Sequence, residues 1–148
     1  IDEQEYKAQL EAKWANDEQN NKVIEARLNE ICKELSNTRG DTDKYLTKEF
    51  KALLDKGWEI GQVDFMEANM WLNAQDWEAI TVEILQFRNF SERRVDVELH
   101  FIDSWAGKKP KQTIAFIFEE NQWLVNDIIN EGDNSVKKYA KDYVNRYR

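Results

Sequence analysis

The chain has 148 residues, with 29 acidic and 21 basic side chains and a formal net charge of −8. Its hydrophobic fraction of 41%, with six Trp, five Tyr and seven Phe, excludes a wholly disordered chain and is enough for one domain with its own core. The acidic balance argues against a nucleic-acid binder and against adsorption to anionic lipid. The single cysteine excludes an internal disulfide, no residue cluster has metal-ligand spacing, and no apolar run has membrane-spanning length. We therefore expect no metal, no cofactor and no membrane span.

The first part of the chain is predicted to be helical, because residues 2–37 contain neither Gly nor Pro and are rich in helix-forming residues. An apolar stripe includes Leu10, Trp14, Ile24, Leu28, Ile31 and Leu35, but Asp17 and Asn21 interrupt it. The pattern leaves two alternatives open, one long helix with a polar interruption or a break near residues 16–21. Residues 1–20 are interpreted as a helical extension of a single domain at residues 21–148, in which Cys32 is expected to be buried.

A second helix is predicted after the polar loop at residues 36–43. Its apolar stripe consists of Tyr45, Leu46, Phe50, Leu53 and Leu54. Thr47 can cap a turn within it, and we expect Gly57 to end it. Residues 58–77 then follow neither a helical nor a strand period, although they contain three tryptophans and two methionines. This aromatic loop is predicted either to close one end of the sheet or to form part of a binding site.

Two strands are predicted next, at residues 78–89 and 95–103. The second has strict alternation, which places Val95, Val97, Leu99 and Phe101 in the core and Asp96, Glu98 and His100 in solvent. In the first, Leu85 and Phe87 fall on the outward face, and a homodimer through this face is a hypothesis.

Residues 111–131 are expected to form two more strands joined by a polar turn. Counting by twos places Asp127 on the same, core-facing side as Trp123, Val125 and Ile129. A carboxylate there needs partners or a wet cavity. We therefore expect Asp127 to lie near residues 73–77, either fastening the aromatic loop or sharing a pocket with it.

A basic amphipathic helix is predicted to follow the turn at residues 132–134, capped by Asn134 or Ser135. Helices followed by successive strands and a last helix indicate an α+β fold, with N-terminal helices on a curved antiparallel sheet and a C-terminal helix.

Three segments also resemble a known family: Tyr45-Leu46-Thr47-x-x-Phe50, the run from Trp71 to Trp77, and Trp123-Leu124-Val125-Asn126-Asp127-Ile128. In order and spacing they are similar to the bacterial domain of unknown function 3828, of the nuclear transport factor 2-like superfamily. The resemblance covers residues 21–148. It implies a cystatin-like α+β cone, often secreted or lipid-anchored at the bacterial envelope, and a location in the periplasm or cell envelope, with the cytoplasm as the alternative.

The resemblance implies no reaction, since this superfamily contains enzymes, binding domains and scaffolds. Our leading hypothesis is a non-catalytic envelope domain that binds a small ligand or a protein partner. One alternative is an isomerase- or dehydratase-type enzyme with Asp127 or Asp76 as general base; the other is a purely structural domain. The candidate ligand-binding residues are Trp71, Asn73, Gln75, Asp76, Trp77, Trp123 and Asp127.

Overall fold

The computed structural model describes residues 1–148 and has an α+β fold, as predicted. Its longer elements are α1 (Glu3–Leu35), α2 (Lys48–Gly61), β1 (Ile80–Ser91), β2 (Arg94–Asp103), β4 (Gln112–Glu119), β5 (Gln122–Asn130) and α3 (Val136–Tyr147). Two short strands, β3 (Gly107–Lys108) and β6 (Asn134–Ser135), and two 3-10 turns, η1 (Asp43–Tyr45) and η2 (Gln62–Asp64), complete it. All strands pair antiparallel, in the order β1-β2-β4-β5-β6, with β3 beside β2.

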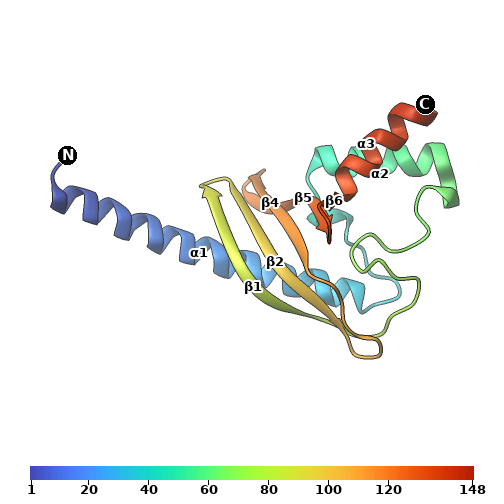
Figure 1. Cartoon of the computed structure of the whole chain (residues 1–148), viewed down its shortest axis with the longest axis horizontal. Helices are drawn as coiled ribbons and strands as arrows, with labels where there is room; N and C mark the ends of the chain where they lie inside the picture. Colours follow the sequence, from blue (N-terminus) through green and yellow to red (C-terminus); the bar gives the residue numbers. More distant parts are fainter.

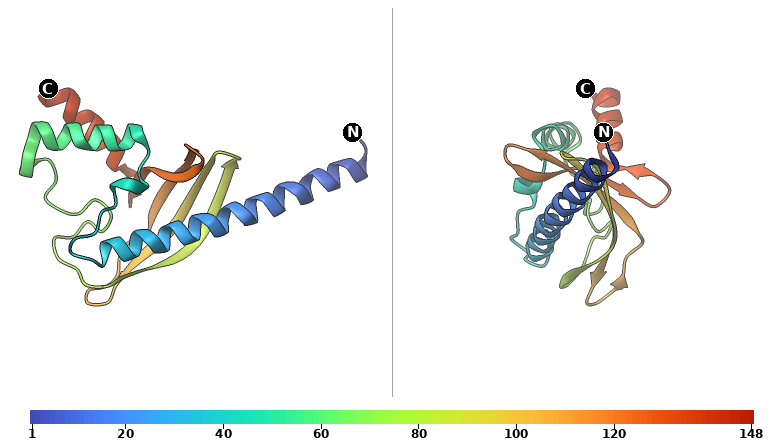
Figure 2. Two further views of the ribbon diagram at one scale, coloured as in Figure 1. Left: turned by 180° about the vertical axis from the view of Figure 1, so that it is seen from behind. Right: turned by 90° about the vertical axis from the view of Figure 1, so that its left-hand side faces the viewer.

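The helices lie in two places relative to the sheet. Helix α1 crosses the sheet and projects beyond it toward the N-terminus, whereas α2 and α3 lie side by side at the other end of the molecule (Figures 1 and 2). The hydrophobic core lies between α1, the sheet and α2, and its buried side chains include Ile24, Leu28, Phe50, Leu99, Phe116 and Ile128. No helix combines the length and apolarity that a membrane crossing requires.

Helix α1 is continuous, so the first of the two alternatives is confirmed. Its polar interruption has a partner, because Asn21 Oδ1 accepts a hydrogen bond of 2.8 Å from Asn89 Nδ2 of β1. Further along, Cys32 is buried, and burial raises the pKa of its thiol to about 12. The first half of α1 has no such cover, and the exposed fractions of Tyr6 and Trp14 are 56% and 60%.

Helix α2 begins later than the sequence predicts, because Tyr45 belongs to the separate 3-10 turn η1 and the helix starts at Lys48. Thr47, expected to cap a turn within the helix, caps its start: Thr47 Oγ1 accepts a hydrogen bond from the Phe50 N–H. The prediction that Gly57 ends it is wrong, because the helix continues to Gly61. Gly57 instead makes room for the Phe65 ring: a Cβ atom at position 57 would lie 2.2 Å from Phe65 Cζ.

Strand β2 has the predicted alternation, with Val95, Val97, Leu99 and Phe101 fully buried. The expectation that the opposite face is solvent-exposed is wrong, since Asp96 is buried and Glu98 and His100 are half-buried. Charged neighbours cover this face. Lys111 and Arg88 bond Glu98 and hold its pKa below the ordinary range.

Two bulges reverse the predicted alternation in β1 and β5. In β5, Ala115 pairs with Asp127 and Phe116 with Val125, so Asn126 is an additional residue without a partner on β4. Beyond it, Ile128 is buried in the core and Asp127 lies on the other face. The prediction that Asp127 and Ile129 face the core is therefore wrong. Likewise Leu85 is the first of two additional residues in β1, and Phe87, expected to point outward, packs on the core.

Candidate functional site

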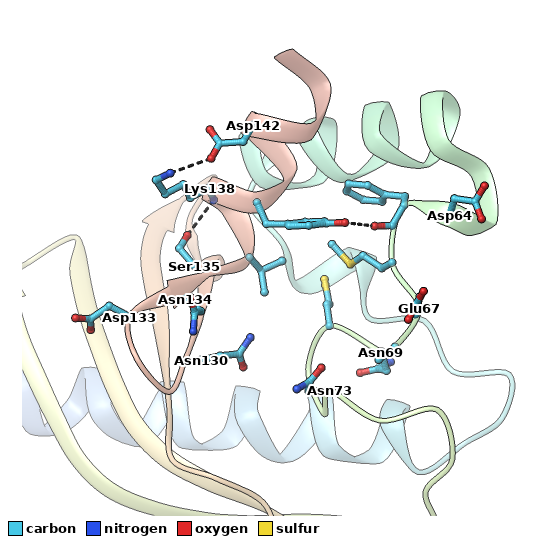
Figure 3. Close-up of a pocket in the computed structure, with 16 residues that line it drawn as sticks. Asp64, Glu67, Asn69, Asn73, Asn130, Asp133, Asn134, Ser135, Lys138 and Asp142 are labelled. Carbon is cyan, nitrogen blue, oxygen red and sulfur yellow. Dashed lines mark hydrogen bonds and ion pairs between the residues drawn. The ribbon is translucent and has the colours of Figure 1, made fainter. Parts of the chain in front are cut away.

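A cleft of about 780 Å³ lies between the aromatic loop, the end of β5 and the start of α3. Its walls come from residues 64–73 on one side and from residues 130–142 on the other (Figure 3). Six of its 16 lining residues are hydrophobic, and its volume is within the range of ligand sites, roughly 300–1,000 Å³.

The aromatic loop is held by its tryptophans. Trp71 Nε1 donates to Thr42 Oγ1 at 3.1 Å, and Trp77 Nε1 donates to the Leu35 carbonyl at 2.6 Å. Within the loop, Asn69 Oδ1 accepts from the N–H groups of Trp71 and Leu72. These bonds fix the loop on the ends of α1 and η1, so this wall of the cleft is preformed.

A buried glutamine joins the two walls. Gln112 Nε2 donates to the Trp71 carbonyl and to Asn130 Oδ1, both at 2.8 Å, and Gln112 Oε1 has no protein partner. Asn130 reaches this position because the bulge at Asn126 turns it toward the core face, where regular alternation would have turned it away. The β5 bulge therefore shapes the cleft.

Three asparagines present free amide groups to the cleft: Asn69, Asn73 and Asn130. The oxygens of Asn69 and Asn130 are already occupied, which leaves their Nδ2 groups as oriented donors. The Asn73 side chain forms no hydrogen bond, and its backbone is left-handed (φ 49°), a conformation that asparagine tolerates better than most residues. Figure 3 shows Asn69, Asn73 and Asn130 around the lower part of the cleft.

Four carboxylates also line the cleft: Asp64, Glu67, Asp133 and Asp142. The one lysine, Lys138, is 2.9 Å from Asp142 and forms an ion pair with it. Four acids and one base give the lining a formal charge of −3, with no cation left for an anionic ligand.

The apolar part of the cleft consists of Phe65, Met66, Met70, Val136 and Tyr139, with Ala68. Tyr139 belongs to α3 and forms part of the cleft wall, and its hydroxyl donates to the Phe65 carbonyl at 2.5 Å. Burial, with Tyr143 and Tyr147 nearby, raises the pKa of Tyr139, so its hydroxyl stays protonated at neutral pH. The Tyr139 side chain is nevertheless partly exposed, because α3 places it at the mouth of the cleft.

Asp127 does not belong to this cleft. One of its oxygens accepts from the N–H groups of Ile128 and Lys137, and the other accepts from Ser135 Oγ at 2.6 Å. The expected contact with residues 73–77 is wrong, because the bulge directs Asp127 to the first turn of α3. Its oxygens are occupied there, so Asp127 has none of the freedom that a general base in an open cone requires.

The other predicted site residues lie in different places. Trp71 is a buried residue of the aromatic loop itself, and Gln75 and Asp76 are exposed without side-chain hydrogen bonds. Trp77 lines a neighbouring cleft of about 380 Å³ that contains Trp58 and Leu54. Trp123 lies at the opposite end, in a groove of about 900 Å³ beside α1. Of the seven candidates, the structure brings only Asn73 into the cleft.

Sequence reasoning missed Asn69, Asn130 and Tyr139. Asn69 lies within the loop that the sequence singles out, and Tyr139 lies in the predicted amphipathic last helix. Asn130 had no usable signal, because the bulge that turns it inward is invisible to a period-two count.

Comparison with known proteins adds little to this description. No protein-family model matches the sequence, and no curated protein matches it. One similar solved structure is a phospholipid-binding protein from Ralstonia solanacearum in complex with a phospholipid, with 14% sequence identity and a TM-score of 0.40. That match covers 89% of this chain and 83% of that chain. At such a TM-score no site can be transferred, so the function has to be inferred from the residues of this chain.

Proposed function

We propose that the chain is a binding domain whose ligand occupies the cleft between the aromatic loop and α3. The observation that carries this proposal is the set of free amide groups on walls that are already fixed by other hydrogen bonds. A preformed cleft with few oriented polar groups and an apolar part is what small-molecule sites have in common.

Binding is favoured over catalysis by the state of the acids in the cleft. Asp64, Glu67 and Asp133 are exposed and form no side-chain hydrogen bonds, and Asp142 is paired with Lys138. A general base needs an orienting partner and a positioned second group. The isomerase alternative would have to find both within this cleft, whereas binding needs neither.

A fragment screen by protein NMR tests the proposal without assuming a ligand class. Mixtures of uncharged, cationic and anionic fragments are expected to shift the backbone amides of residues 64–73 and 130–139. Ala68→Tyr, which places a ring in the cleft, should abolish these shifts. Ala26→Tyr, the same change on the exposed surface of α1, should leave them intact. Shifts that gather elsewhere, or no shifts, would contradict the proposal.

A protein partner is the second candidate, and the first half of α1 favours it. Tyr6 and Trp14 lie on the same apolar stripe as the buried Ile24, but more than half of each side chain is exposed, and Leu10 between them is half-buried. A homodimer, first predicted from Leu85 and Phe87, could use this surface instead, since Phe87 packs on the core. Sedimentation of the wild type and of Trp14→Ala tests it: a dimer should form only in the wild type.

Family and location belong to the same proposal. Membership of the domain of unknown function 3828 and of the nuclear transport factor 2-like superfamily is supported by the three motifs and by the α+β order of elements. An envelope location follows from that membership. Fractionation of bacterial cells, with the full-length protein detected in the periplasmic or membrane fraction, tests the location.

A further inference from the structure

We propose that the ligand of the cleft is an uncharged, hydroxyl-rich molecule of the saccharide type. This inference rests on the proposed binding function and specifies the chemistry of its ligand. It follows from which hydrogen-bonding groups of the cleft are free and which are already occupied.

The cleft has both free hydrogen-bond donors and free hydrogen-bond acceptors. Asn69 Nδ2 and Asn130 Nδ2 can only donate, because their amide oxygens accept bonds from Trp71, Leu72 and Gln112. Asn73 can donate and accept, and the carboxylates of Glu67 and Asp133 can only accept. A hydroxyl group both donates and accepts, so neighbouring hydroxyls can satisfy the two kinds together.

Charged ligands fit this set less well. An anion would use the amide donors but would meet a lining with a formal charge of −3, whose only lysine is paired with Asp142. A cation would use the carboxylates but would leave the amide N–H groups of Asn69 and Asn130 without acceptors. Such unpaired donors lower affinity, because they lose their hydrogen bonds to water on binding.

The apolar wall supplies the remaining feature. Tyr139, with an exposed fraction of 46%, lines the cleft together with Met66, Met70 and Val136. A sugar ring has an apolar face of C–H groups, and an aromatic side chain is a rigid partner for such a face. Donors, acceptors and an apolar wall thus meet in one cleft.

Asparagine-to-aspartate substitutions separate the possible ligand classes. Asn69→Asp and Asn130→Asp keep the oxygen that accepts the structural hydrogen bonds. Asn73→Asp is the third substitution, because aspartate also tolerates the left-handed backbone at position 73. Each change removes donors and adds a negative charge. Asn29→Asp, on the exposed surface of α1, makes the same change away from the cleft and is the matched control.

The probes are maltotriose, cellotriose and chitotriose, with spermidine as the cation and glucose 6-phosphate as the anion. Binding is followed by NMR titration of the amides of residues 64–73 and 130–139. We expect at least one trisaccharide to bind there, and each cleft substitution to weaken it about 3- to 10-fold, the loss of one hydrogen bond. Asn29→Asp should change nothing.

The outcomes are distinct. If spermidine alone binds and the aspartate variants tighten it, the saccharide inference is overturned while the binding function stands. Binding of glucose 6-phosphate alone, or of trisaccharides outside the cleft, also overturns it. If neither these probes nor the fragments bind in the cleft, the proposed function fails as well. Tyr139→Phe, which keeps the ring, should retain trisaccharide binding, whereas Tyr139→Ser should lose it with the fold unchanged by circular dichroism.

Discussion

Strands β2 and β5 lie in the same sheet, each with one face on the core, but they treat their acidic residues in opposite ways. In β2 the alternation runs without interruption from Val95 to Asp103, so Asp103 ends on the core face with an exposed fraction of 1%. In β5 the additional residue Asn126 reverses the alternation, and Asp127 leaves the core face. The inserted residue decides that Asp127 lies on the outer face of β5.

Both carboxylates bind backbone N–H groups, but they fasten different segments. Asp103 accepts from the N–H groups of Glu78 and Trp105, which ties the start of β1 to the end of β2. Asp127 accepts from Lys137 N–H and Ser135 Oγ, which fixes the first turn of α3. The bulge residue contributes too, since Asn126 Oδ1 accepts from Thr47 Oγ1 and Lys137 Nζ. The irregular strand therefore positions two helices, and the regular strand mainly builds the core.

The largest expected effect tests the bulge directly. Ile128→Ala should lower the free energy of unfolding by about 2–5 kcal/mol, as should Leu99→Ala in β2, because both side chains are fully buried. Ile129→Ala should have a much smaller effect, since Ile129 is half-buried on the other face. Urea denaturation measures all three. A larger loss for Ile129→Ala than for Ile128→Ala would mean that β5 has no bulge.

Asp127→Ala should destabilise the fold by about 1–3 kcal/mol, because it leaves donors of the first turn of α3 unpaired. Asp127→Asn is the matched control, since its oxygen still accepts from Lys137 N–H, and its effect should be smaller. Hydrogen exchange of the Lys137 amide should become faster in the alanine variant. Faster exchange in residues 73–77 instead would restore the aromatic loop as the partner of Asp127.

The bulge in β1 gives a similar contrast. Phe87→Ala should cost about 1–3 kcal/mol, because the ring packs on the core, whereas Leu85→Ala should change stability by less than about 0.5 kcal/mol. Equilibrium unfolding of the two variants measures the difference. Equal effects would contradict the register found for β1.

The smallest expected effect is the contribution of Asp103, the acid at the end of β2, to the pH dependence of stability. Burial would raise the pKa of Asp103, but the N–H groups of Trp105 and Glu78 outweigh it and hold that pKa below the ordinary value. The resulting stabilisation is fully present above the unfolded-state pKa, about 4, and is lost as the pH falls through the lower folded-state pKa. Asp103→Asn cannot titrate, so its stability should fall less steeply than that of the wild type as the pH is lowered below about 4. Parallel slopes in urea titrations would show that Asp103 contributes nothing to the pH dependence.

Regular and irregular elements also differ in how well the sequence predicts them. The α+β class, the β2 alternation, the caps at Thr47 and Ser135 and the burial of Cys32 follow from local composition and period, and the structure confirms them. The cleft was predicted only in part. Residues 58–77 were singled out because of their composition. Asn130 was missed because its orientation depends on the bulge at Asn126, four residues earlier in β5.

The sequence by itself determined which segments are helices and strands, because helix formers and alternating side chains act within a few residues. Only the tertiary structure decided where bulges interrupt the strands: Asn126, the bulge residue of β5, bonds Thr47 and Lys137, which are 79 and 11 positions away in the sequence. It also decided that the stripe of α1 is buried at Ile24 and exposed at Trp14, since the N-terminal part of α1 projects beyond the sheet (Figure 1). Contacts between distant segments set these features, and no local period encodes them.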